Sequence, residues 1–328
     1  MDIVNLGVDS VPEIISLLKK VWADSYGENS YPHFTEDYLR WLYGGPNENR
    51  NILRGVRNKM GDLIAFRVDL YRPANLNGQR RDAYVSRHLA IDPKASFNQR
   101  LSVAAEFGRL VPIERDRSAV SVAYYETEKH IAKTSKRLAM RRGMQIFEQR
   151  FSQFVVNRKK LLAKEESSIE LEALKLTAAD CDEAVNLLSS RSSEKSLLWA
   201  PNANELAYHT LNAPEHFSLI ARSSSGKLVG LIGCYALDLM QASQKKRILI
   251  CETLAVRCPN VANFLLRRAL DYSDNVGARG VVIENASYLS DEVIMAAGLL
   301  RSPRQMIYAI RGIDLPPTLS EGFSTDLK

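Results

Sequence analysis

The chain of 328 residues repeats one order of predicted elements in its two halves, and this repetition constrains the fold more than any single motif. Hydrophobic periodicity, helix caps and turn signals predict the order β-α-α-β-β-β-α-β-α-β in each half. One early helix begins at Ser10-Val-Pro-Glu13, and its counterpart begins at Thr177 with Asp180 three residues later. Because single domains commonly have about 100 to 200 residues, the length also favours two domains. We therefore expect an α/β (α+β) fold of two tandem domains, each with a mixed central sheet flanked by helices.

The predicted boundaries follow the composition of the chain. We place a first domain at 1–156, a basic linker at 157–168, a second domain at 169–314 and a tail at 315–328. The linker reads Asn157-Arg-Lys-Lys-Leu-Leu-Ala-Lys-Glu-Glu-Ser-Ser168, and its density of charge is typical of a solvated connection.

Targeting and redox signals are sparse. The start, MDIVNLGVDS, carries acidic residues where a signal peptide needs basic ones, and no run approaches the roughly 18 apolar residues of a membrane span. We therefore expect a cytoplasmic protein. The four cysteines all fall in the second half without CxxC spacing, which predicts reduced thiols and no metal site. They are Cys181, Cys234, Cys251 and Cys258.

The formal net charge of +6 suits an anionic partner such as a phosphorylated cofactor, an acidic carrier protein or a nucleic acid. Much of the excess lies within 133–142 and 158–160. No aromatic residue occurs between His130 and Ile146, whereas a surface that binds single strands needs aromatic residues for base stacking. We therefore expect no nucleic-acid partner, and we interpret the charge as a solvated helix face plus a linker.

Two strand ends carry matching sequences. The first half has Arg87-His-Leu-Ala-Ile-Asp-Pro93, and Glu252-Thr-Leu-Ala-Val256 stands at the corresponding place in the second half. Each half also ends its last helix with Gly and an apolar residue, Gly143-Met144 and Gly298-Leu299. In element order and in these motifs, nearly the whole chain resembles the GNAT (GCN5-related N-acetyltransferase) superfamily of acyl-CoA-dependent N-acyltransferases. The resemblance implies two tandem GNAT-like domains.

The resemblance also implies a place for an acyl donor. In this family the pantetheine arm of acyl-CoA pairs with the backbone where the fourth strand parts from the fifth, and the pyrophosphate binds free amides at the start of the next helix. The family's loop there reads Arg or Gln, two residues, Gly, one residue, then Gly or Ala. The first half has Lys94-Ala-Ser-Phe-Asn-Gln-Arg100, with no glycine, whereas Arg257-Cys-Pro-Asn260-Val-Ala262 keeps the spacing if Asn260 replaces the first glycine.

The second half is therefore the predicted donor site, for acetyl-CoA or another acyl-CoA as co-substrate. Asn tolerates left-handed backbone angles better than other non-glycine residues, and Pro259 suits the first turn of a helix. The alternative is a plain helix start with Arg257 on the surface. The predicted donor-binding residues are Leu254, Ala255, Val256, Arg257, Asn260, Val261 and Ala262.

Acyl transfer to an amine needs a group that removes a proton and a group that protonates the leaving thiolate. In many relatives the base is a Glu on the fourth strand, and Glu252 stands there after the apolar run Ile248-Leu-Ile-Cys251. The alternative is that Glu252 points outward or pairs with Arg247 or Lys246.

The family's thiolate acid is often a Tyr on the last helix. Ile294 and Met295 stand in that region of the second half, so the candidate acid is Tyr288 in the preceding loop, with Tyr125 as its counterpart in the first half. Both tyrosines are alternatively packed aromatic residues. His88 is a further candidate that could titrate near neutrality, or a structural histidine within its strand.

Aromatic residues recur before the second strand of each predicted domain, and they line an acceptor pocket or pack in the core. They are Tyr38, Trp41 and Tyr43 in the first half and Trp199 and Tyr208 in the second.

The leading hypothesis is an acyl-CoA-dependent N-acyltransferase that transfers an acetyl group to an amine of a small molecule or sugar. One alternative takes the acyl group from an acyl carrier protein, whose acidic surface would suit the positive net charge. The other is a non-catalytic binding or scaffold protein, which the missing glycines favour. The sequence does not indicate an oligomeric state.

Overall fold

The computed structural model describes residues 1–27, 31–109, 113–114, 116–126, 136–137, 139–156, 171–191, 196–241, 244–285, 289–321 and 324–325. The predicted linker lies outside these residues, as does Tyr288. In the described part, no helix is long and apolar enough to cross a membrane.

The first half begins with a helix whose apolar residues recur at helical spacing. Val11, Ile14, Leu17 and Leu18 of α1 are buried, so one stripe of this helix covers the sheet. The elements of this half are β1 (Asp2–Asn5), α1 (Val11–Tyr26), β2 (Tyr31–His33), α2 (Glu36–Tyr43), β3 (Ile52–Arg57), β4 (Leu63–Leu76), β5 (Gln79–Ile91), α3 (Phe97–Phe107), β6 (Val120–Glu126) and β7 (Gln145–Val156).

Among the described elements, the second half repeats this order and has one further helix, α9 (Asp291–Ala296), before its last long strand. Its elements are β8 (Leu171–Lys175), α6 (Cys181–Ser189), β9 (Ser196–Trp199), α7 (Ala203–Leu211), β10 (His216–Ser223), β11 (Leu228–Gln241), β12 (Gln244–Val256), α8 (Pro259–Asn275), β13 (Val281–Asn285), α9 (Asp291–Ala296) and β14 (Leu299–Gly312), followed by β15 (Ser324–Thr325). The predicted fold class, a mixed sheet flanked by helices in each half, is confirmed.

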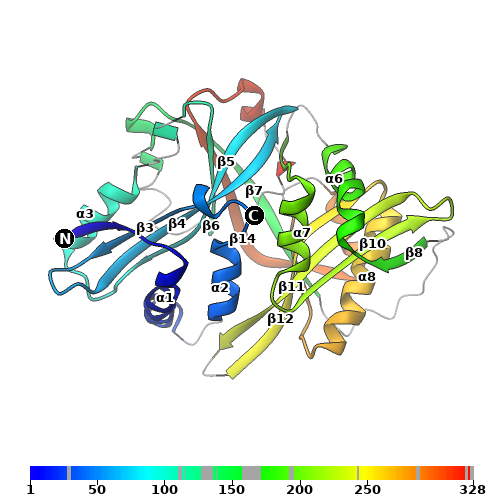
Figure 1. Cartoon of the computed structure of the whole chain (residues 1–328), viewed down its shortest axis with the longest axis horizontal. Helices are drawn as coiled ribbons and strands as arrows, with labels where there is room; N and C mark the ends of the chain where they lie inside the picture. Colours follow the sequence, from blue (N-terminus) through cyan, green and yellow to red (C-terminus); the bar gives the residue numbers. More distant parts are fainter. Residues whose placement is uncertain are drawn as a thin grey trace.

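The two halves exchange their last strands and share one sheet. The strand order is β1-β3-β4-β5-β6-β14-β7-β13-β12-β11-β10-β8. Strand β14, from the end of the second half, lies between β6 and β7, while β7 of the first half pairs with β13 of the second. Both strands run through the middle of the molecule in Figure 1. The sheet therefore continues without a break from one half to the other.

A second exchange involves the short strands between the first two helices of each half. Strand β2 of the first half pairs with β11 of the second, through Asp238↔His33 and its neighbours. Strand β9 of the second half pairs with β4 of the first, through Ala74↔Trp199. Since β4 and β11 occupy the same place in the order, the exchange is reciprocal, and the halves are related by an approximate two-fold axis.

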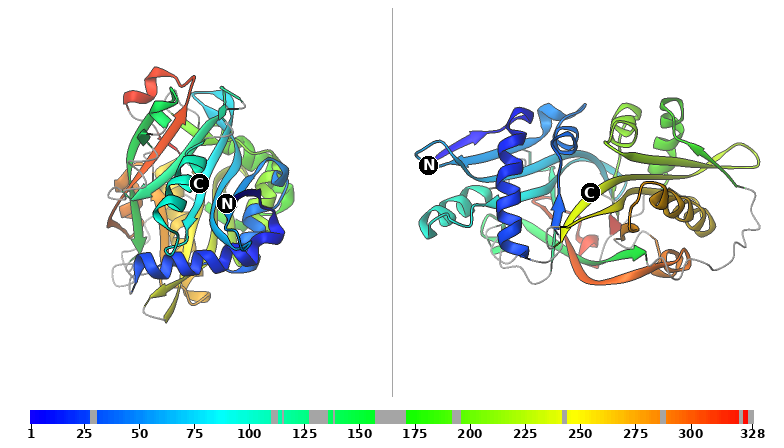
Figure 2. Two further views of the ribbon diagram at one scale, coloured as in Figure 1. Left: turned by 90° about the vertical axis from the view of Figure 1, so that its left-hand side faces the viewer. Right: turned by 90° about the horizontal axis from the view of Figure 1, so that it is seen from below.

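Helices cover both faces of the shared sheet. In the right-hand view of Figure 2, α6 and α7 (green) lie on one side of the second half's strands and α8 (gold) lies on the other. In the first half, α1 and α2 share a core with Phe66 and Val68, whereas Val103 and Phe107 of α3 pack on the opposite face with Ala65. One core includes buried residues of both halves, such as Val85 and Leu231, so the two halves bury apolar surface against each other.

Candidate functional site

Each half carries a β-bulge at the same position. The pairing of β4 with β5 shifts between Val68 and Asp69, which leaves Arg87 as the extra residue on β5. The pairing of β11 with β12 shifts between Gly233 and Cys234, which leaves Glu252 as the extra residue on β12. Bulges redirect the side chain of the extra residue. The matching sequences at 87–93 and 252–256 are therefore structurally equivalent. Each bulge redirects one charged side chain, that of Arg87 in the first half and that of Glu252 in the second.

These two side chains meet between the halves. Nη2 of Arg87 donates a hydrogen bond to Oε1 of Glu252, and Nη1 of Arg87 donates one to the Tyr124 hydroxyl oxygen at 2.8 Å. The side chains of Arg87 and Glu252 are 10% and 19% exposed. Burial opposes the charge of Arg87, but Tyr124 and Glu252 more than offset this effect, so the pKa of Arg87 lies well above its ordinary value.

The partners considered for Glu252 from the sequence bind elsewhere. Arg247 forms ion pairs with Asp238 and Glu215. Lys246 donates to Gln241. The pairing of Glu252 with either residue is thus wrong, because the bulge turns Glu252 toward the other half.

The strands part at the bulges. The parallel pairing of β5 with β6 extends to Ser86, and the pairing of β12 with β13 extends to Cys251. The amide of Asp92 donates to Ile64 on β4, and that of Arg257 donates to Val229 on β11. Backbone N–H and C=O groups of successive residues point to opposite edges of a strand. The backbone groups of residues 89 and 91 therefore face the gap between β5 and β6, and those of residues 254 and 256 face the gap between β12 and β13. Both halves thus present a strand edge beside the bulge.

The two edges differ in access. Leu89 of the first half is 38% exposed, whereas Leu254 of the second is 3% exposed. In addition, the Leu254 carbonyl oxygen accepts a hydrogen bond of 3.2 Å from Nη1 of Arg191, just after α6. Among the described residues, the edge in the first half is therefore the more exposed one, and the edge in the second half is covered by Arg191.

The starts of the helices that follow these edges also differ, but here the second half is the more accessible one. In α3 the Ser96 hydroxyl accepts from the Gln99 amide, and the Gln99 side chain accepts from the Ser96 amide, so a capping box closes the helix start. Helix α8 follows Cys258, which makes no side-chain cap, and it begins with Pro259. Its first turn leaves amides available for an anion.

The remaining predicted donor residues divide between surface and core. Arg257 and Asn260 are exposed. The side chains of Ala255, Val261 and Ala262 are buried, and Val256 is half-buried. A Cβ atom at Gly230 would come within 2.4 Å of Cγ1 of Val261, so this glycine permits the close approach of α8 to the sheet. Tyr125 lies in β6.

The predicted aromatic residues join the halves. Nε1 of Trp41 donates to the Tyr208 carbonyl oxygen at 3.2 Å, and the Tyr208 hydroxyl donates to the Trp41 carbonyl oxygen at 2.9 Å. Gly45 has φ +93°, and a Cβ atom there would come within 2.4 Å of the Tyr208 ring. The rings of Trp41 and Trp199 both pack edge-on against His209. These aromatic residues form the interface core around His209.

His88 is a structural histidine, as the alternative interpretation held. Nδ1 of His88 lies 2.7 Å from the Tyr43 hydroxyl, and burial, assisted by the charge of Arg87, lowers the pKa of His88 to about 3. Burial also raises the pKa of Tyr43 well above its ordinary value, so a neutral phenol and a neutral imidazole share this hydrogen bond. Titration of His88 near neutrality is therefore wrong.

Two further residues of this interface, His209 and Arg72, were not among the predicted site residues. Burial and the charges of Arg72 and Arg87 lower the pKa of His209 well below its ordinary value. The Arg72 side chain extends from β4, is 6% exposed, and has its pKa lowered to about 10 by burial and by Arg87. Charged residues within the mostly buried strand β4 are an unusual signal, but Arg67 and Asp69 share it, so it does not single out Arg72. We call Arg72, Arg87, His209, Glu205 and Glu252 the central cluster.

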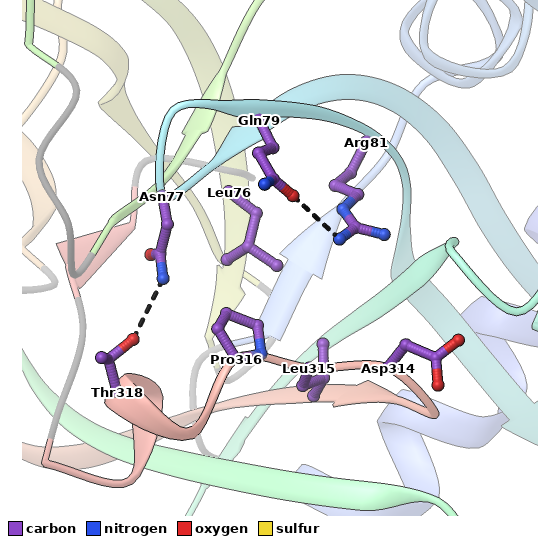
Figure 3. A pocket seen from close by; sticks show the side chains of 8 residues that line it. All are labelled: Leu76, Asn77, Gln79, Arg81, Asp314, Leu315, Pro316 and Thr318. Carbon is purple, nitrogen blue, oxygen red and sulfur yellow. Dashed lines mark hydrogen bonds between the residues drawn. The ribbon is translucent and has the colours of Figure 1, made fainter.

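A surface hollow of about 530 Å³ lies elsewhere, between the β4–β5 turn and the segment after β14 (Figure 3). Asn77 donates to Thr318 across it, and Arg81 donates to Gln79 on its wall. None of the predicted site residues lines it. We therefore base the candidate site on the bulges and the central cluster, where the charged groups gather.

Comparison with known proteins identifies the fold. No protein-family model matches the sequence, and no curated protein sequence matches it. The structure is similar to that of N-myristoyltransferase from Saccharomyces cerevisiae with bound myristoyl-CoA, with a TM-score of 0.68 at 13% identity over 94% of this chain and 78% of that one. It is also similar to a GCN5-related N-acetyltransferase from Sphaerobacter thermophilus, with a TM-score of 0.57 at 14% identity over 95% of each chain.

The chain has the tandem fold of the GNAT superfamily. The fold implied by the sequence motifs is thus confirmed.

Proposed function

We propose that this GNAT-fold protein is an acyl-CoA-dependent N-acyltransferase and that its reacting centre lies at the Arg87–Glu252 pair. The observation that carries the proposal is the meeting of two equivalent β-bulges, each at the point where two strands part. A thioester held along one parted strand would present its carbonyl group at the bulge, next to the charged side chains. The fold, which N-acyltransferases share, supports the same activity.

The donor binds to the second half in this proposal. The uncapped start of α8 offers amides to a pyrophosphate, and the exposed Arg257 adds positive charge. Pantetheine would pair with the edge at Leu254 and Val256, which requires Arg191 to leave the Leu254 carbonyl oxygen. Both acetyl-CoA and longer acyl-CoAs are candidates, since one structural neighbour binds myristoyl-CoA.

The reaction follows from the groups at the centre. The acceptor amine attacks the thioester carbonyl carbon, a C–N bond forms, and the C–S bond breaks. Glu252 takes the proton that the amine loses, and a backbone amide at the bulge polarises the carbonyl oxygen. Tyr288 remains the proposed donor of a proton to the CoA thiolate. The acceptor is a small molecule with an amine.

Calorimetric titration with acetyl-CoA and with myristoyl-CoA tests this proposal. Asn98 and Asn260 occupy the second position of α3 and of α8, so Asn98→Trp and Asn260→Trp form a matched pair. Wild type and Asn98→Trp should bind one of the CoA thioesters, and Asn260→Trp should bind it about 10- to 100-fold more weakly, because the indole covers the helix start.

The other outcomes are equally informative. Loss of binding only in Asn98→Trp would move the donor to the first half. If neither thioester binds, the acyl-CoA proposal fails, and transfer from a purified acyl carrier protein would then separate a carrier-dependent enzyme from a binding or scaffold protein.

A further inference from the structure

Arg72 is a buried cation without an ion-pair partner among the described residues. Its guanidinium donates Nη1 to the Tyr71 carbonyl oxygen at 3.0 Å, and the residue is 6% exposed. A buried charge is costly unless a counter-charge or several hydrogen bonds compensate it. Most of the donors of Arg72 are therefore available to another group.

Other buried arginines of the first half are compensated. Arg54 pairs with Glu106 at 3.2 Å, and Arg67 pairs with Asp69 at 2.7 Å. Arg87 pairs with Glu252, but Nε of Arg87 is buried without a hydrogen-bond partner. Nε of Arg54 is likewise buried without a hydrogen-bond partner, so what sets Arg72 apart from these three arginines is that it has no ion-pair partner among the described residues.

The neighbours of Arg72 do not neutralise it directly. The Glu205 carboxylate lies near enough to influence Arg72, but it accepts from Asn47 at 2.6 Å and from the Asn202 amide at 2.8 Å. His209 is neutral, because burial and the two arginines lower its pKa. The cluster therefore combines the unused donors of Arg72 with the Glu252 carboxylate, which is paired with Arg87.

The charge balance of the central cluster restricts which molecules can bind there. Arg72 and Arg87 together balance Glu205 and Glu252, so the cluster is neutral when it is empty. A bare ammonium would add a net positive charge to a region where charges are poorly solvated. A molecule with an ammonium and a carboxylate adds no net charge, and each of its groups finds an opposite charge.

We infer that the central cluster binds an acceptor that carries a carboxylate next to its amine, that is, an amino acid. Arg72 and the free Nε edge of Arg87 hold the carboxylate, and Glu252 faces the amine. Planar guanidinium groups bind carboxylates through paired, charge-assisted hydrogen bonds. This inference rests on the proposed function, since it names the acceptor of the same reaction.

The test is calorimetric titration of the full chain with each of the common L-amino acids and with the corresponding carboxamides, which lack the carboxylate. At least one amino acid should bind about 10- to 100-fold more tightly than its carboxamide. Arg72→Met should weaken binding of that amino acid by a similar factor and leave the carboxamide unchanged. Arg54→Met removes a buried arginine outside the cluster and should leave both affinities unchanged.

Folding is verified by near-ultraviolet circular dichroism, and Arg72→Lys, which keeps the positive charge, provides a second variant that should retain part of the preference. The inference is overturned if no amino acid binds, if carboxamides bind equally well, or if Arg72→Met weakens both ligands alike. Amino-acid binding that depends on Arg72 without thioester consumption would overturn the proposed function alone. Acylation of amines without preference for a carboxylate would overturn the inference alone.

Discussion

The two halves of the molecule have the same scaffold but differ at the two places where an acyl donor would bind. The first half has an exposed strand edge at Leu89 and a helix start closed by Ser96 and Gln99. The second half has a strand edge covered by Arg191 and a helix start without a side-chain cap. The first half thus offers an accessible strand edge, and the second half offers an uncapped helix start. Because both halves have the bulge, its geometry does not by itself decide which half binds the acyl donor.

The buried residues of the two halves differ as well. The buried pair Arg67–Asp69 in the first half occupies the positions of Ile232 and Cys234 in the second, as the equivalent strand registers indicate. At the bulges themselves, arginine in one half faces glutamate in the other. Where equivalent positions meet across the approximate two-fold axis, opposite charges join the halves.

The largest effect is expected from Glu252→Gln. If Glu252 is the base of the reaction, kcat for acyl transfer should fall by about two to four orders of magnitude, because the amide cannot take a proton. Glu284→Gln, on β13 beside Gln153, is the control and should stay close to wild type. Unchanged turnover in Glu252→Gln would exclude it as the base.

Removal of Arg67 should produce the largest loss of stability. Arg67→Met leaves the Asp69 carboxylate, 1% exposed, without its ion-pair partner and should lower the free energy of unfolding by about 3–5 kcal/mol. The double variant Arg67→Ile with Asp69→Cys installs the residues of the second half and should recover most of this loss. Urea unfolding measures both, and a double variant as unstable as the single one would mean that the two sites pack differently.

The buried histidines make stability depend on pH. The pKa of His88 is about 3 in the folded chain, against an ordinary value of 6.5, so below about pH 6.5 the unfolded chain binds a proton that the folded chain does not. The free energy of unfolding should therefore fall as the pH drops from 6.5, by up to about 1.4 kcal/mol per pH unit for this residue.

His209, whose pKa is also lowered, adds a change of the same sign. Urea unfolding at pH 7, 6 and 5 measures the slope, and His88→Gln should reduce it. A slope that is identical in wild type and His88→Gln would show that His88 is not protected from protonation in the folded state.

The smallest effect concerns the covered edge of the second half. Arg191→Ala removes the hydrogen bond from Arg191 to the Leu254 carbonyl oxygen and should tighten acyl-CoA binding by about two- to tenfold, since the ligand no longer displaces that bond. Calorimetric titration measures this change. Weaker binding would mean instead that Arg191 contacts the donor.

Much of the scaffold could be predicted from the sequence because local signals determine it. The order of elements and the correspondence of Arg87-His-Leu-Ala-Ile with Glu252-Thr-Leu-Ala-Val follow from periodicity and spacing. The exchange of β7 and β14 could not be predicted, since either strand presents a pattern that fits either half. Strands β2 and β9 were missed because segments of three and four residues carry too little periodicity.

The site depends on contacts between distant residues. Arg87 and Glu252 are 165 residues apart, and no local pattern indicates that they meet. The capping box at Ser96 has a signature in Ser-Phe-Asn-Gln, but the prediction for this segment rested on its missing glycines alone. Arg191 reaches the Leu254 edge from beyond the end of α6, which only the tertiary structure reveals.

Hydrogen–deuterium exchange with saturating acyl-CoA distinguishes directly between the two halves as the donor site. Peptides over 253–262 and 88–99 contain the parted strand edge and the helix start of the second and first halves. We predict protection of 253–262 on binding and no change in 88–99. Protection of 88–99 alone would be incompatible with a donor site in the second half and would assign the donor to the half with the open strand edge.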